Sequence, residues 1–143
     1  VFKIGKQLPP LPLAAFDLEV PIVAAHGERG RVYFFWATWC GPCKKAIGPL
    51  QKWARTHGVD VVSITSESRA DVDTFLKKRG GWPFAIALDS SGRVSRQFKV
   101  SNLPQFVLVG PTGIYLSRGV GYRENIPLDG TLLGEMKKKH RKD

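Results

Sequence analysis

The stretch Trp36-Ala37-Thr38-Trp39-Cys40-Gly41-Pro42-Cys43-Lys44 decides the fold, because it holds both cysteines of the 143-residue chain, separated by only two residues. It ends an apolar run that begins at Val32 and precedes a helical pattern, so Cys40 is expected where a strand meets a helix. The free N–H groups and the dipole of a helix N-terminus stabilise an anion, which favours the thiolate form of a cysteine there. Cys40 is therefore the candidate nucleophile.

The second cysteine, Cys43, lies one helical turn further along, close enough to form a disulfide with Cys40 yet turned towards the protein. This position suits a resolving thiol. Pro42 fits the first helical turn, where its missing N–H costs little. A Cys-x-x-Cys pair can also be half of a zinc site, but the chain has no further cysteine, and its three histidines are too scattered to complete a ligand set (His26, His57 and His140).

The block from Phe35 to Lys44 resembles the active site of the thioredoxin superfamily, in particular the TlpA, ResA and CcmG branch of thiol-disulfide proteins. The resemblance covers about Ala14 to Lys139 in element order. It implies an α/β fold of the thioredoxin-like three-layer α/β/α type, with an N-terminal extension and an inserted helix-strand unit. It also implies no cofactor beyond the redox-active disulfide of Cys40 and Cys43. The ligand count given above predicts no metal.

Composition predicts one domain over residues 1–143, because 143 residues with 43% hydrophobic content suffice for one core. No apolar run reaches the roughly 20 residues of a membrane span, and the N-terminus lacks the apolar run of a secretion signal. The net charge is +10. The basic residues are spread along the chain except for a cluster in the tail at 137–143, so we expect no nucleic-acid partner. Attraction to acidic partners or anionic lipid stays open.

The first half of the chain predicts an arm and a βαβ unit. Residues 1–13 are rich in proline and should form an extended arm over the domain. A short strand is expected at 14–20 and a central one at 32–36. The helix that follows the cysteines should end at Gly58, and residues 59–65 should form a parallel strand with a right-handed crossover.

The second half predicts the inserted unit and a hairpin. Ser68 should cap a helix that ends at Gly80, followed by a strand at 84–88. A short helix over 93–100, a hairpin of strands at 106–109 and 114–116, and a last helix from about Glu124 to Lys139 complete the chain.

Pro104 stands between a loop and a strand. The spacing alone favours a trans proline that begins an edge strand. The resemblance instead implies a cis Leu103–Pro104 bond packed beside the cysteines, with the backbone of Leu103 pairing with an extended substrate. Gln105 departs from the threonine that is common after this proline.

Glu67 follows the strand that ends at Thr65, so it should lie at the edge of the sheet that presents Cys40. A carboxylate there can accept the proton of Cys43 during exchange. The resemblance strengthens this role, because TlpA-like proteins have a glutamate at the matching place and Phe34 occupies the position of thioredoxin's buried aspartate. The alternative is a solvated loop residue.

The residues around the cysteines should form the substrate surface. Trp36 is expected in the core and Trp39 at the rim of that surface. The predicted substrate-binding residues are Trp39, Gly41, Pro42, Leu103 and Pro104. Thr38 stands one residue too close to Cys40 for the T-x-x-C pattern of peroxidases, so peroxidase activity is not expected.

We therefore predict a protein-disulfide oxidoreductase that reduces its targets, because the Gly-Pro pair between the cysteines matches thioredoxin. The resemblance implies a periplasmic or extracytoplasmic location and allows a membrane anchor in the full-length precursor. It also implies that the protein takes electrons from a membrane thiol-disulfide donor. We expect a monomer that acts on disulfide-bonded proteins, with cytochrome c maturation or metal-centre assembly as target classes. One alternative is a copper(I)-binding metallochaperone, because a pair of thiolates can also bind a soft metal. It lacks an obvious third ligand, since Met136 is the only methionine of the chain. The other alternative is a general cytosolic thioredoxin.

Overall fold

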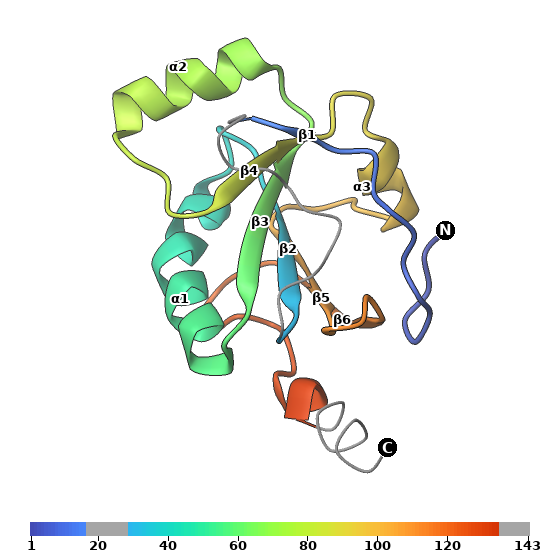
Figure 1. Cartoon of the computed structure of the whole chain (residues 1–143). Coiled ribbons are helices and arrows are strands. Elements are labelled where there is room, and N and C mark those ends of the chain that lie inside the picture. The colour runs from blue at the N-terminus through green and yellow to red at the C-terminus, as the bar shows by residue number, and fades with distance from the viewer. Residues whose placement is uncertain (17–28, 135–143) are drawn as a thin grey trace.

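The computed structural model describes residues 1–16 and 29–134, and within them the strands form one mixed sheet in the order β1-β4-β3-β2-β5-β6 (Figure 1). The strands are β1 (Ala14–Ala15), β2 (Arg31–Phe35), β3 (Asp60–Thr65), β4 (Ala85–Leu88), β5 (Gln105–Val109) and β6 (Tyr115–Val120). The helices are α1 (Gly41–His57), α2 (Arg69–Arg79) and α3 (Arg93–Gln97).

Strand β2 is the apolar run that precedes the cysteines, and all five of its residues are buried. It pairs in parallel with β3 and antiparallel with β5, so both of its edges are covered. Its alternating side chains enter two separate cores: Phe34 lies in one, and Tyr33 and Phe35 lie in the other. The prediction of a central strand covered on both faces is confirmed, as is the parallel βαβ unit.

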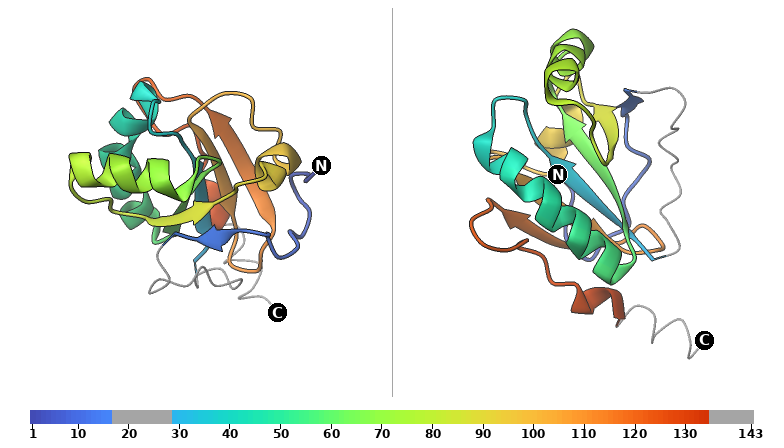
Figure 2. Two further views of the ribbon diagram at one scale, coloured as in Figure 1. Left: turned by 90° about the horizontal axis from the view of Figure 1, so that it is seen from above. Right: turned by 90° about the vertical axis from the view of Figure 1, so that its left-hand side faces the viewer.

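Helices cover the two faces of the sheet unequally, as the two views of Figure 2 show. The first core joins the sheet to α1 through Ile47 and Leu50 and to α2 through Val72. The second core joins the sheet to α3 through Val94 and to the N-terminal arm through Leu8. The predicted three-layer α/β/α fold is confirmed.

Residues 1–13 lie along the β5–β6 hairpin and α3. The N–H of Phe2 donates to the carbonyl of Gln97 at 2.9 Å, and its ring lies edge-on to that of Phe98. Further along, the N–H of Leu8 donates to the carbonyl of Gly113 at 2.9 Å. The Leu8 side chain is only 7% exposed, so the arm contributes a side chain to the second core.

The helix-strand unit α2–β4 extends the sheet beyond β3. The hydroxyl of Ser68 caps α2 by accepting a hydrogen bond from the N–H of Asp71 at 3.1 Å, and Gly80 ends the helix. Strand β4 then pairs in parallel with β3. The predicted cap, stop and strand are all confirmed.

The prediction for the C-terminal helix is wrong at its start. No residue from 124 to 130 is helical, and the helix begins at Thr131. Pro127 explains the delay, because a proline disfavours helical backbone at the residue before it. The side chain of Asp129 accepts from the N–H and hydroxyl of Thr131, at 3.0 and 2.6 Å, where the helix begins.

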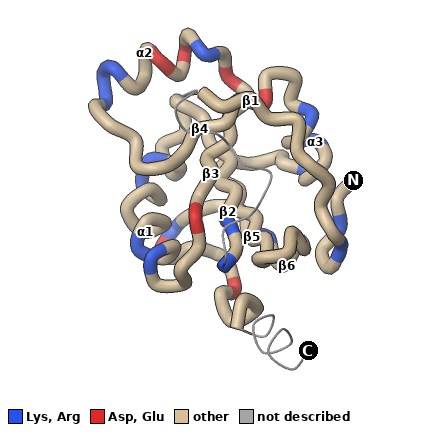
Figure 3. The backbone as a smooth tube through the Cα atoms, viewed as in Figure 1, with Lys and Arg blue, Asp and Glu red and all other residues tan. Residues whose placement is uncertain are grey.

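Two other predicted segments fall partly or wholly outside the described residues. Strand β1 contains Ala14 and Ala15, whereas residues 17–20 of the predicted first strand are not described. The basic tail at 137–143 is likewise outside them. Within the described residues, Lys and Arg are spread over the arm, α1, α2 and α3 (Figure 3). No helix among these residues is long and apolar enough to cross a membrane.

Candidate active site

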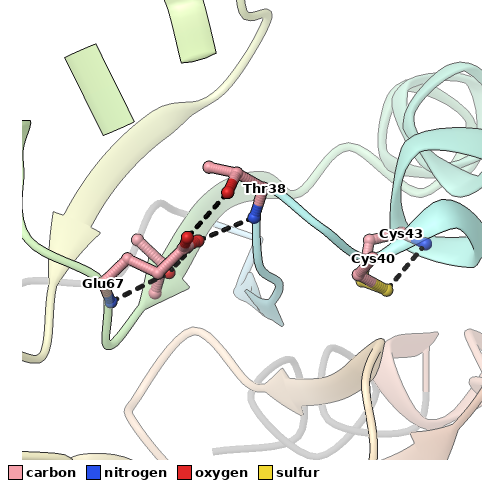
Figure 4. The surroundings of a disulfide bond; sticks show 5 residues. Thr38, Cys40, Cys43 and Glu67 are labelled. Carbon is pink, nitrogen blue, oxygen red and sulfur yellow. Dashed lines mark hydrogen bonds between the residues drawn. A yellow bond between two sulfur atoms is a disulfide. The ribbon is translucent and has the colours of Figure 1, made fainter. Parts of the chain in front are cut away.

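The site begins where β2 ends and α1 starts. Cys40 is the N-cap of α1 with extended backbone, and its Sγ accepts a hydrogen bond from the N–H of Cys43 at 3.2 Å (Figure 4). Pro42 lies in the first turn, where it takes no hydrogen bond from the helix. The N-terminal N–H groups of a helix favour negative charge. The thiolate of reduced Cys40 is therefore placed where the backbone stabilises it.

Cys40 and Cys43 are joined by a disulfide, with 5.3 Å between their Cα atoms. Cys43 is fully buried beneath the first turn of α1, and Cys40 retains 4% exposure. Both belong to the core formed by β2, α1 and α2. Access to the disulfide is therefore through Cys40, as its predicted nucleophilic role requires.

The peptide bond between Leu103 and Pro104 is cis, as predicted from the resemblance. Pro104 is buried and Leu103 is half-buried. Gln105 does not face a substrate, because it is fully buried and its Nε2 donates to the carbonyl of Phe98 at 3.1 Å. The glutamine that replaces the common threonine therefore contacts Phe98, a residue of the second core.

Glu67 is half-buried at the carboxyl end of β3, beside the loop that carries Cys40. Its carboxylate accepts from the N–H and the hydroxyl of Thr38, each at 2.7 Å, and from the hydroxyl of Thr65 at 3.2 Å. Figure 4 shows the carboxylate directed at Thr38 and the disulfide further along the same loop. Glu67 therefore holds the loop between β2 and the nucleophile.

The sequence did not single out Thr38 as the partner of Glu67. A signal existed, since Thr38 and Glu67 each follow one of two neighbouring parallel strands, whose carboxyl ends meet at one edge of the sheet. The side-chain contact itself spans 29 residues. It depends on the loop geometry after both strands, which the pattern does not specify.

The two tryptophans of the motif have the predicted locations. Trp36 is 2% exposed and stacks on Trp82 with 4.2 Å between ring centroids, so it is part of the core. Trp39 is 74% exposed, next to Cys40. An indole left in water beside a reactive disulfide is typical of a contact surface.

Two grooves share Leu103. The first, of about 570 Å³, includes Trp39 and Glu67 in its lining. The second, of about 460 Å³, includes Pro42, which precedes Cys43. The residues lining the second groove are Pro42, Leu103, Val120, Gly121, Tyr122, Arg123, Asn125 and Pro127. The predicted substrate-binding residues Trp39, Pro42 and Leu103 thus line these two grooves.

Within residues 1–16 and 29–134, no group of three or more His, Cys, Asp or Glu side chains is close enough to hold a metal ion.

Comparison with known proteins identifies the family. The model of the AhpC/TSA family matches residues 4–116. The chain belongs to the AhpC/TSA family. Its membership agrees with the thioredoxin-like resemblance, which is confirmed.

The curated relatives are named as thiol-disulfide oxidoreductases or interchange proteins. The thiol-disulfide oxidoreductase ResA of Bacillus subtilis (strain 168) is 36% identical over 89 residues, covering 59% of this chain and 49% of ResA. The chain thus spans about half the length of that relative. The thiol:disulfide interchange protein CycY of Rhizobium leguminosarum bv. viciae is 28% identical over 130 residues, covering 89% of this chain and 70% of CycY. The predicted enzyme class is the class of these relatives.

Solved structures resemble the whole fold. A thio-disulfide isomerase from Thermus thermophilus superposes with a TM-score of 0.66 at 25% identity, over 96% of each chain. StoA from Bacillus subtilis superposes with a TM-score of 0.62 at 24% identity, over 90% of this chain and 99% of StoA. Both likenesses extend over nine-tenths or more of this chain.

Proposed function

We propose that the protein is a thiol-disulfide oxidoreductase that reduces disulfides in extracytoplasmic target proteins. The observation that carries the proposal is the Cys40–Cys43 disulfide at the N-terminus of α1, reachable through Cys40 and flanked by two grooves that share Leu103. The names of the relatives support the same chemistry.

In each step of the reaction one disulfide bond breaks as another forms. The thiolate of reduced Cys40 attacks one sulfur of the target disulfide, a mixed disulfide forms, and the second target sulfur leaves as a thiolate. The thiolate of Cys43 then attacks the Sγ of Cys40, which closes the Cys40–Cys43 disulfide and releases the first target sulfur. Two electrons have passed to the target. A dithiol donor, which we expect in the membrane, returns them.

Glu67 is assigned two roles in this scheme. Its bonds to Thr38 hold the loop before Cys40, which is a positioning role. We also propose that its carboxylate accepts the proton of Cys43 as the mixed disulfide resolves. The two roles predict different kinetics.

The direct test is a single turnover. Reduced protein is mixed with a disulfide-bonded test protein, and free target thiols are counted after acid quenching. We expect stoichiometric reduction by wild type, an accumulated mixed disulfide with Cys43→Ser, and no reaction with Cys40→Ser. Oxidation of target dithiols by the disulfide form, with no reduction by the dithiol form, would reverse the proposed direction.

The physiological target classes, cytochrome c maturation and metal-centre assembly, are tested by trapping. Cys43→Ser should retain a target as a mixed disulfide in a periplasmic extract, and Cys40→Ser is the matched control. Recovery of apocytochromes or metal-centre assembly proteins with the first variant alone would support the proposal. Recovery only of cytosolic proteins from whole cells would favour a general thioredoxin.

A further inference from the structure

We infer that Arg123 forms a subsite for an acidic side chain of the target, on one side of the reacting cysteine. The inference rests on the proposed function, since the occupant is a segment of the protein being reduced. It names a specificity determinant that lies outside the Cys-x-x-Cys motif and far from it in sequence.

The β5–β6 hairpin places this residue beside the site. Val120 at the end of β6 pairs with Gln105 at the start of β5. The next residue, Gly121, donates its N–H to the carbonyl of Pro104 at 2.7 Å. The chain that leaves β6 therefore runs against the cis proline, and Arg123 lies two residues beyond that contact.

The groove formed there is suited to a polypeptide. It is lined by Pro42, Leu103, Val120 and Tyr122 together with Arg123. Val120 is 46% exposed. Within the described residues only four large apolar side chains are exposed, Val1, Ile4, Trp39 and Val120, and two of these four line the grooves that share Leu103. Exposed apolar surface next to a reactive group indicates a contact surface.

The charge of the groove indicates the occupant. Arg123 is exposed and makes no hydrogen bond or ion pair with any residue of the described chain. Glu124 follows it but does not line the groove. The first turn of α1 carries no acidic residue, and Lys44 and Lys45 lie exposed near its start. A carboxylate on the target can therefore pair with Arg123 without displacing a partner.

The other groove has the opposite charge. Its lining includes Glu67 and no basic residue. A target segment that crosses Leu103 thus meets Arg123 on one side of its cysteine and Glu67 on the other. We expect a preference for Glu or Asp on one side only. General attraction by the net charge of +10 would instead favour acidic residues on both sides.

The experiment uses nine-residue peptides whose central cysteine is disulfide-bonded to 5-thio-2-nitrobenzoate. Glu, Gln or Lys is placed in turn at the three positions before and the three positions after the cysteine. The thiolate of Cys40 in the reduced protein attacks the peptide sulfur, the peptide becomes disulfide-bonded to Cys40, and the coloured thiolate leaves. Its absorbance gives the second-order rate constant for each peptide.

For wild type we expect Glu to react about two- to five-fold faster than Gln on one side of the cysteine, as for an exposed ion pair. Added salt should reduce the ratio. Arg123→Gln should abolish it and Arg123→Glu should reverse it. Arg55→Gln, which removes the same charge from the last turn of α1, is the matched control and should retain it.

The outcomes separate the two proposals. If wild type reduces the peptides and the ratio of Glu to Gln rates is the same in Arg123→Gln, the subsite is wrong and disulfide reduction stands. Equal preference on both sides, or none, also overturns the subsite. If wild type releases the coloured thiolate from no peptide and reduces no protein disulfide, the proposed function is wrong as well.

Discussion

Cys40 and Cys43 differ by three positions in the chain and by their relation to the end of one helix. The Sγ of Cys40 is the capping acceptor of α1, whereas Cys43 lies inside the first turn with no exposed surface. A cap position favours a thiolate because unpaired N–H groups point at it. The backbone geometry therefore supports the proposed roles of Cys40 as nucleophile and Cys43 as resolving thiol.

This asymmetry predicts the order of alkylation. In reduced protein, iodoacetamide should modify Cys40 faster than Cys43 from about pH 5 to 9, because the thiolate is the reacting species and only Cys40 is reachable. Mass spectrometry of quenched samples gives both rates. Cys40→Ser and Cys43→Ser serve as single-thiol controls. Faster modification of Cys43 would contradict the assigned roles.

A substitution of Glu67 tests its proposed role as the proton acceptor for Cys43. If its carboxylate accepts the Cys43 proton, Glu67→Gln should slow release of the mixed disulfide by about 10- to 1,000-fold, with Cys40 attack nearly intact. Thr38→Val removes one of the hydrogen bonds to the carboxylate but keeps the acceptor, so its release rate should stay near that of wild type. Rapid-quench single turnovers measure both steps.

The two variants distinguish chemistry from positioning. Equal slowing of attack and release in Glu67→Gln and Thr38→Val would mean that the carboxylate only holds the loop. Release that is unchanged in Glu67→Gln between about pH 5 and 8 would remove the proton-accepting role. Slower release in Glu67→Gln, with attack by Cys40 intact and with release near the wild-type rate in Thr38→Val, would support it.

At the scale of elements, three segments converge on the disulfide. Helix α1 presents Cys40, the loop after β3 supplies Glu67, and the β5–β6 hairpin brings Pro104 together with residues 120–123. The loop after β2 lies between the ends of β3 and β5, which pair with β2 on either side. The hydrogen bonds between β2 and its two neighbouring strands therefore fix the position of the loop that carries Cys40.

The N-terminal arm supports this hairpin from the second core. Leu8→Ala should lower the free energy of unfolding by about 2 to 3 kcal/mol, because it leaves a cavity where a buried side chain was. Ile4→Ala, in the same arm, is the matched control; Ile4 is 53% exposed, so its loss should stay within about 0.5 kcal/mol. Urea unfolding of the oxidised protein measures both. Equal losses would place Leu8 outside the core.

Across the whole molecule, the sequence predicted elements better than contacts. The run before Cys40 and the stop at Gly58 are local signals, so β2 and α1 followed from them. The Thr38–Glu67 contact and the Arg123 groove join residues from separate elements, and no local pattern specifies them. The predicted last helix begins at Thr131 and not at about Glu124, although Pro127 is a local signal against helical backbone at the residue before it.

The second core also determines how the molecule responds to alkali. Burial raises the pKa of Tyr115 above its usual range, although the charge of Arg118 acts in the opposite direction. The pKa of Tyr33, in the same core, is raised by burial too, against the effect of Arg31. In the unfolded chain a tyrosine ionises near pH 10. Above that pH, the unfolded state binds fewer protons than the folded state.

The sign of the effect follows from proton linkage. The stabilisation is fully present below the unfolded pKa, and it is lost as the pH rises through the raised folded pKa. Each such tyrosine should lower the free energy of unfolding by at most about 1.4 kcal/mol per pH unit in that window. Urea unfolding at steps between about pH 8 and 11 gives the slope.

Tyr115→Phe has no phenolic proton, so the slope of its free energy of unfolding against pH should be shallower than that of wild type. A double variant with Tyr33→Phe should have a slope that is shallower still. Stabilities at pH 7 provide the baseline for each variant. If the slopes of wild type and Tyr115→Phe coincide above pH 10, Tyr115 ionises equally in both states and its burial has no effect on alkaline stability.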